Sequence, residues 1–240
     1  MIENLALLSF GNGGWGVVIL LSAGTTLSLA FCCMLLGLPL GLLNAVMMQS
    51  NVKIVRAIAS SFSSVFRSLP ELLTLFLVYY GLQSLIQTVL ECFNIKMIFN
   101  ISSFTAGILA LSMVFAAFSC EVWLGAFKIF DKGQYEAAKA LGLSRSNTFF
   151  RIVFPQLLRN ALPGLTNNWL TLLKDTSLVS TISLVDIMRQ TSLAAAATSK
   201  PLLFYLVACL LYLLLSAFFS TIFRHLESRT QIEYQKALVK

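Results

Sequence analysis

Residues 201–223 read PLLFYLVACLLYLLLSAFFSTIF, and no Asp, Glu, Lys, Arg or His interrupts this run. A helix needs about 20 predominantly apolar residues to cross a hydrocarbon core about 30 Å thick. The run therefore predicts a membrane-spanning helix near residues 201–224. A chain that contains such a helix is expected to be an integral membrane protein.

Three more stretches lack the same five residue types, namely 4–52, 72–90 and 97–120. Only 11% of the 240 residues are charged, against about 25% in an ordinary soluble domain. The chain is therefore expected to be an all-α, polytopic membrane helical bundle in one transmembrane domain, residues 1–240. We expect its five transmembrane helices near residues 17–48, 69–90, 104–127, 161–183 and 201–224.

The distribution of basic residues predicts the orientation. With the N-terminus outside, 13 of the 17 Lys and Arg residues fall on the cytoplasmic side, three fall outside and Lys174 lies within the membrane. Cytoplasmic loops are enriched in positive charge, so we expect an outside N-terminus and a cytoplasmic C-terminus in the cell inner membrane. Only an odd number of spans gives this result. The net charge of +7 then reflects topology and contact with anionic membrane lipid, and nucleic-acid binding is a remote alternative.

The main hydrophilic interruption is the cytoplasmic segment 128–160. Residues 134–141 are rich in helix-forming types, and Gly142 can adopt the left-handed conformation that ends many helices. The sequence predicts a helix of about two turns here. Because so short a helix is marginal in water, we expect it to be stable only when docked on its own membrane helices and on another protein.

This segment contains a spaced set of residues, in order Tyr135, Glu136, Ala137, Ala138, Gly142, Ile152, Phe154 and Pro155. The spacing resembles the EAA loop of ABC importer permeases, in which Leu is usual at the position of Phe154. The resemblance implies a coupling helix that docks into a cleft of an ATPase subunit, with Tyr135 to Ala138, Gly142 and Pro155 in the contact. The alternative is an ordinary amphipathic cytoplasmic linker.

The resemblance extends over nearly the whole chain. Residues 67–73 (RSLPELL) and 77–81 (LVYYG) resemble the second-helix signature of polar amino acid permeases, and residues 161–180 resemble their fourth-helix region. Within that group the sequence is most similar to the histidine/arginine (basic amino acid) permease subunits. It departs from them at Leu124, where relatives commonly have Arg, so no role for a charge at this position carries over.

The resemblance also implies partners. These are a second permease subunit, homologous or identical, two ATPase subunits, and an extracytoplasmic binding protein that delivers the amino acid substrate. Arginine, histidine, lysine and ornithine all fit as substrates, with uncharged polar amino acids as the alternative. The chain has no G-x-x-x-x-G-K-[ST] loop, so a partner is expected to bind the ATP, and this chain is expected to be no enzyme and to hold no cofactor. Its five cysteines form no C-x-x-C pair and predict no metal site.

Glu71 and Glu121 are candidate residues of a translocation path. Ionisable groups in apolar helices usually face a bundle interior or a water-filled path, so Glu121 would offer negative charge to a cationic amino acid. Its alternative role is a structural hydrogen bond to a neighbouring helix or loop. For Glu71, the sequence Ser68-Leu-Pro-Glu71 matches the spacing of a capping box, and helix capping is favoured over path lining.

A polar stripe marks the expected fourth membrane helix. Asn167, Thr171 and Lys174 are spaced i, i+4 and i+7 and share one face, with Asn168 and Asp175 flanking it. Such a stripe should point away from lipid, toward the path or toward the partner permease, unless the helix is interfacial. Two other protein classes stay open, a stand-alone ion-coupled secondary transporter and a membrane scaffold.

Overall fold

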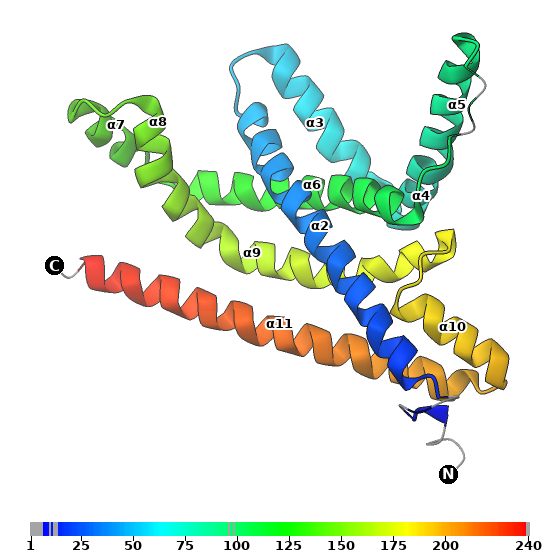
Figure 1. Cartoon of the computed structure of the whole chain (residues 1–240). Coiled ribbons are helices and arrows are strands. Elements are labelled where there is room, and N and C mark those ends of the chain that lie inside the picture. The colour runs from blue at the N-terminus through cyan, green and yellow to red at the C-terminus, as the bar shows by residue number, and fades with distance from the viewer. Residues whose placement is uncertain (1–6, 10, 12–13, 96, 98, 239–240) are drawn as a thin grey trace.

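The structure is a computed structural model that describes residues 7–9, 11, 14–95, 97 and 99–238. Every regular element among these residues is helical; η1 and η2 are π-helical and η3 is a 3-10 helix. The elements (Figure 1) are α2 (Gly16–Met48), α3 (Lys53–Ser68), α4 (Glu71–Phe76), η1 (Leu77–Gly81), α5 (Leu82–Cys92), α6 (Ser103–Ile129), α7 (Lys132–Ala140), α8 (Arg145–Thr148), η2 (Phe149–Val153), α9 (Phe154–Asp175), η3 (Thr176–Ile182), α10 (Ile187–Thr198) and α11 (Pro201–Leu238).

Four helical stretches are long and apolar enough to cross a membrane. They are Gly16–Met48, Glu71–Cys92, Ser103–Ile129 and Pro201–Thr230. The all-helical membrane bundle is therefore confirmed, together with four of the expected spans. α9 is not among the four, since polar and charged residues are spread along it, and the fifth span stays a prediction.

The centre of the bundle is the pair α2 and α6, which pack most extensively. Small buried residues recur at every fourth position of α2, at Cys33, Gly37, Gly41 and Ala45. A Cβ atom added at Gly41 would lie 2.8 Å from the carbonyl oxygen of Ala116 in α6. Small residues let membrane helices approach closely, so the glycines of α2 allow direct backbone contact with α6.

The main hydrophobic core forms where α9, η3 and α11 pack on these two helices. Trp169 of α9 is 1% exposed. Its ring lies 4.9 Å from that of Phe31 in α2 and 5.3 Å from that of Phe219 in α11, measured between centroids. This aromatic contact fixes the rotation of α9 about its axis and so determines which of its side chains face inward.

The expected helix 69–90 begins with a break in the chain. α3 ends at Ser68, Leu69 and Pro70 are extended, and α4 begins at Glu71. The predicted capping box is wrong, because Pro70 is the N-cap and no side chain caps α4. Pro70 disfavours the helical conformation for the residue before it, so the chain straightens and Ser68 stays the last residue of α3.

The expected helix near 161–183 is longer than predicted. A continuous helical run begins at Arg145 and ends at Ile182, and Ser144 caps its start by accepting a hydrogen bond from the Asn147 N–H at 3.3 Å. The predicted start at residue 161 is therefore wrong. Pro155 does not interrupt the run, because it directly follows the π-helical turn η2, whose wider backbone accommodates a residue without an N–H.

Two helices were not anticipated from the sequence, and one extends further than expected. α3 has 16 residues and α10 has 12, both short of the length of about 20 that a span requires. Neither therefore produces a long apolar run. α11 continues to Leu238 instead of ending near 224. The polar residues that follow its apolar stretch are therefore helical as well.

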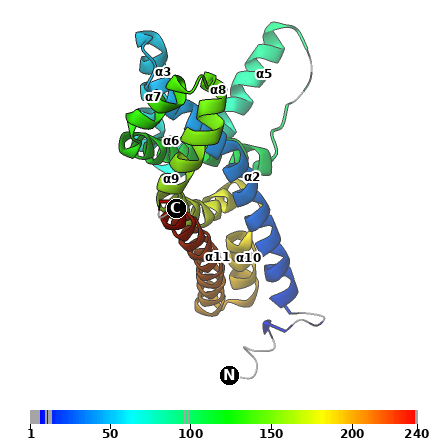
Figure 2. The ribbon, with the colours of Figure 1, turned by 90° about the vertical axis from the view of Figure 1, so that its left-hand side faces the viewer.

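The helix ends divide between two sides of the molecule. α7, α8 and the C-terminal end of α11 lie at one end, on the left of Figure 1. The start of α2, α10 and the start of α11 lie at the opposite end, as the second view also shows (Figure 2). The short helix expected to couple to a partner and the C-terminal helix end thus share one side, as the predicted orientation requires.

α5 stands apart from the bundle (Figure 1), and none of its residues is buried. The chain that returns from it to α6 is held along its side by polar contacts. Gln83 donates to Asn100 at 3.1 Å, and the Phe99 N–H donates to Gln87 at 3.3 Å. α5 and its return segment therefore form an arm, which packs on the main core through Leu82 and Phe99 and has no buried residue in α5.

Candidate functional site

A cavity of about 210 Å³ lies between α4, α6 and α9. Its polar lining consists of Glu71, Asn168, Thr171 and Asp175. Its apolar wall consists of Leu111, Val114, Phe115, Phe118 and Leu172. The fold therefore brings two carboxyl groups, an amide and a hydroxyl into one space with apolar walls.

α9 supplies three of the polar groups from a single face. Asn168, Thr171 and Asp175 are spaced i, i+3 and i+7, which aligns them along a helix. The buried Trp169 packs toward α2 and α11 and so turns the Asn168 face toward α4. The Nδ2 atom of Asn168 is buried and has no hydrogen-bond partner among the described residues. An unsatisfied buried donor is costly, and a ligand that accepts a hydrogen bond there would satisfy it.

Glu71 enters the cavity as the first residue of α4. The buried residues Thr74 and Leu75 hold this short helix in place, and a carboxylate in the first turn is favoured by the helix dipole. Asp175 lines the same cavity from α9. Two carboxylates in a poorly solvated space repel each other, and a cation between them relieves that repulsion. The cavity is therefore suited to a cationic group.

Three of the predicted path residues, Glu71, Thr171 and Asp175, are thus brought together. Asn168 joins them, although the sequence pattern placed it beside the polar stripe and not within the candidate set. Its spacing of seven residues from Asp175 indicates that the two side chains share one face of the helix. The rotation of α9 that selects this face depends on Trp169, whose packing the sequence does not reveal.

The predicted stripe of Asn167, Thr171 and Lys174 does not face one space. Thr171 is the only one of the three that lines the cavity, and Asn167 is exposed. Lys174 lines a separate cavity of about 270 Å³ against η3, α10 and α11, together with Tyr205 and Tyr212. The stripe covers two neighbouring sides of α9, so Lys174 and Asp175 do not serve the same space.

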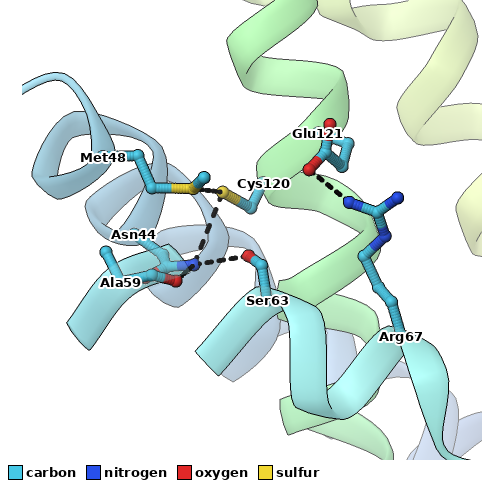
Figure 3. A network of polar contacts seen from close by, with 7 residues as sticks. All are labelled: Asn44, Met48, Ala59, Ser63, Arg67, Cys120 and Glu121. Carbon is cyan, nitrogen blue, oxygen red and sulfur yellow. Dashed lines mark hydrogen bonds and ion pairs between the residues drawn. The ribbon is translucent and has the colours of Figure 1, made fainter. Parts of the chain in front are cut away.

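Glu121 lies outside the cavity lining and forms an ion pair with Arg67 at the end of α3 (Figure 3). The two side chains are 44% and 39% exposed, respectively. This is the helix-to-helix contact that the structural interpretation of Glu121 anticipated. Arg67 was not singled out from the sequence, because its partner lies 54 residues away along the chain.

At the other end of the molecule, α7 is the short helix expected within residues 134–141. α7 ends at Ala140, and Gly142 lies in the turn that follows, with a φ of +72° in the left-handed region. The Leu143 N–H donates to the Ala138 carbonyl at 3.1 Å, and the Gly142 N–H donates to the Lys139 carbonyl at 3.0 Å. These two bonds form the Schellman motif. The glycine cap predicted from the sequence is confirmed.

α7 has one face against the bundle and one face open. Ala138 is 1% exposed, whereas Leu141 is 80% exposed and Tyr135 is 42% exposed. On the bundle side, Gln134 accepts a hydrogen bond from Gln156 of α9. The other predicted coupling residues are exposed: Glu136, Ala137, Gly142 and Pro155.

A large cavity of about 810 Å³ lies where α7 meets the nearby ends of α2 and α6. Tyr135 and Glu136 of α7 line it, as do Phe127, Phe130 and Arg145. α7 therefore contacts the bundle through the buried Ala138 and through Gln134, and the cavity separates another part of it from α2 and α6.

Comparison with known proteins gives consistent results. The profile of the family described as "Binding-protein-dependent transport system inner membrane component" matches residues 37–232. The arginine ABC transporter permease protein ArtQ of Escherichia coli strain K12 is 38% identical over 220 residues, which cover 87% of this chain and 92% of that protein. The histidine/lysine/arginine/ornithine transport system permease protein HisQ of the same strain is 35% identical over 224 residues, covering 93% and 98%.

A solved structure has the same arrangement of helices. It is described as the crystal structure of an amino acid ABC transporter with histidines. The TM-score is 0.75 at 30% sequence identity, and the match covers 90% of this chain and 95% of the other. The family match over residues 37–232 includes every residue that lines the cavity and the whole of α7.

Proposed function

The chain belongs to the family of binding-protein-dependent transport system inner membrane components, and on this basis we propose that it carries cationic amino acids through the cavity between α4, α6 and α9. It is a multi-pass permease component of an ABC importer in the inner membrane. Family membership leaves no reason to retain the stand-alone secondary transporter or the scaffold as interpretations. The proposed substrates are arginine, histidine, lysine and ornithine.

The observation that supports this proposal is the pairing of Glu71 and Asp175 in one cavity. A guanidinium or ammonium group placed between them forms charge-assisted hydrogen bonds, which are stronger than neutral ones. Asn168 would donate its unpaired amide hydrogen to the substrate carboxylate, and Thr171 would contribute a hydroxyl. Relatives named for arginine and for histidine, lysine, arginine and ornithine transport support the same substrate class.

The energy source proposed for this transport is ATP hydrolysis by partner subunits. We expect two ATPases in the complex, one of which engages α7 of this chain through its open face, where Leu141 and Tyr135 are exposed. A second permease subunit, identical or homologous, would complete the path, and an extracytoplasmic binding protein would deliver the substrate. In this proposal, closure of the ATPases displaces α7, and α6 and α9 carry the displacement to the cavity.

The proposal is tested by arginine binding to the purified permease–ATPase complex without the binding protein. Glu71→Gln and Asp175→Asn should each weaken the Kd for arginine about tenfold, equivalent to about 1.4 kcal/mol. Binding of the neutral amino acid glutamine should change less. Glu91→Gln is the matched control, because this exposed glutamate lies in the same span as Glu71 but outside the cavity.

An unchanged Kd for arginine in both cavity variants would rule out this cavity as the cation site. Equal weakening of arginine and glutamine would assign the two carboxylates a general packing role. The basal ATP hydrolysis rate of each variant reports whether its complex has assembled.

A further inference from the structure

The end of α3 is held to α2 and α6 by a set of polar contacts. Asn44 of α2 is buried, and its amide donates to the Ala59 carbonyl at 3.2 Å and to the Ser63 hydroxyl at 2.8 Å (Figure 3). The same amide lies 3.5 Å from the sulfur of Cys120 in α6. One turn further along α3, Arg67 pairs with Glu121 of α6.

These contacts follow one face of α3. Ala59, Ser63 and Arg67 are spaced four residues apart, which aligns them along a helix. Their partners lie on two helices that pack closely on each other through the glycines of α2. The face is therefore anchored to the rigid centre of the bundle, with Arg67 as its last polar anchor before α3 ends.

The break between α3 and α4 follows Arg67 directly. Ser68 is the last residue of α3, the next two residues are extended, and Glu71 begins α4. Four residues span at most about 14 Å of extended chain. The position of the Glu71 backbone is thus tied to Arg67 by a short tether, although the two residues belong to different helices.

We propose that the Arg67–Glu121 ion pair is a positioning pair, which holds the end of α3 against α6 and thereby sets where the Glu71 carboxylate enters the cavity. This inference rests on the proposed function, in which Glu71 contacts the substrate. It assigns Glu121 a role through Arg67 and Glu71 and not a contact with the substrate.

The location of the pair strengthens the argument. Both side chains are about two-fifths exposed, and an ion pair with that exposure would be weak in water. Glu121 follows the uncharged stretch 97–120, about 27 Å along α6 from its first residue, so the pair lies near the predicted cytoplasmic end of a span about 30 Å long. A charge that loses its partner at this boundary can turn toward water, so loss of either residue should free the end of α3 from α6.

The test is a double-mutant cycle read by arginine binding to the purified permease–ATPase complex. Arg67→Gln and Glu121→Gln should each weaken the Kd for arginine about fivefold to tenfold while thermal stability changes little. In a Glu71→Gln background, Arg67→Gln should have no further effect on the Kd. The charge exchange Arg67→Glu with Glu121→Arg should restore the Kd to within about threefold of the unmodified value.

The matched control is Arg56→Gln, which removes another exposed arginine from α3, far from the break. Its Kd for arginine should be unchanged. If Arg67→Gln weakens binding equally with and without Glu71, or if the single variants and the charge exchange all fail to assemble, the pair has a structural role only and the inference is wrong. If Glu71→Gln itself leaves the Kd for arginine unchanged, the proposed function is wrong. That result differs from the one that would contradict the positioning pair alone.

Discussion

Gly142 lies in the turn after α7 in a left-handed backbone conformation. Its φ of +72° lies in the region that residues with a Cβ atom avoid. A Cβ added there would meet no atom within 4 Å. A substitution at this position therefore tests the conformation alone, without a steric clash.

We expect Gly142→Ala to destabilise the end of α7 by about 1–2 kcal/mol, the cost of a left-handed conformation for a residue with a side chain. The variant should hydrolyse ATP but transport fewer amino acid molecules for each ATP. The measurement is the ratio of uptake to hydrolysis in proteoliposomes with the binding protein present. Gly125→Ala in α6 is the control, since its Cβ would also meet nothing and its backbone is helical. An unchanged ratio in Gly142→Ala would exclude a role for this cap in coupling.

The residues of the cavity were partly predictable from the sequence. Asp175 and Thr171 were found because polar residues in a membrane helix are unfavourable against lipid. The sequence pattern left Asn168 out of the candidate set and included Lys174, because it predicts only the relative angles between side chains around α9. The absolute rotation is set by Trp169 against Phe31 and Phe219, contacts between helices that are distant along the chain.

At the scale of elements, the contact between α2 and α6 is where the fold tolerates least change. Gly41→Ala would place a Cβ 2.8 Å from a backbone oxygen of α6, so the two helices would have to separate. We expect a loss of about 1–3 kcal/mol, the usual cost of overpacking, measured as a lower Tm and a lower yield of monodisperse complex. Gly24→Ala in the same helix is the control, because its Cβ would meet nothing. Equal stability of the two variants would contradict the close-packing account.

The sequence predicted long apolar elements well and short ones poorly. α6 and the apolar part of α11 were located because an uncharged run of sufficient length has few alternatives. α3 and α10 are too short to produce such a signal. The break at Pro70 was mistaken for part of a capping motif, since the same residues satisfy both patterns locally. Only the packing of α3 on α2 and α6 shows that Ser68 closes one helix instead of starting the next.

At the scale of the whole molecule, the testable claim is the direction in which the chain crosses the membrane. Cys92 ends α5, and Leu141 follows α7; both positions are exposed. A membrane-impermeant maleimide should label Cys92 in right-side-out vesicles. It should label a Leu141→Cys variant that also carries Cys92→Ser only in inside-out vesicles. The Cys92→Ser variant that keeps Leu141 is the control, because any labelling of it comes from the other cysteines. Labelling at both positions from the same side would overturn the orientation.

The arm formed by α5 has a consequence for the life of the subunit before it joins a complex. Its own chain covers α5 only along the side of the return segment, so the rest of its surface must be covered by lipid or by a neighbouring subunit. Glutamines and a glutamate lie along this arm, at Gln83, Gln87 and Glu91, and lipid solvates such groups poorly. We therefore expect a single copy to be less stable against unfolding than the same copy in its complex, with α5 as its least stable helix.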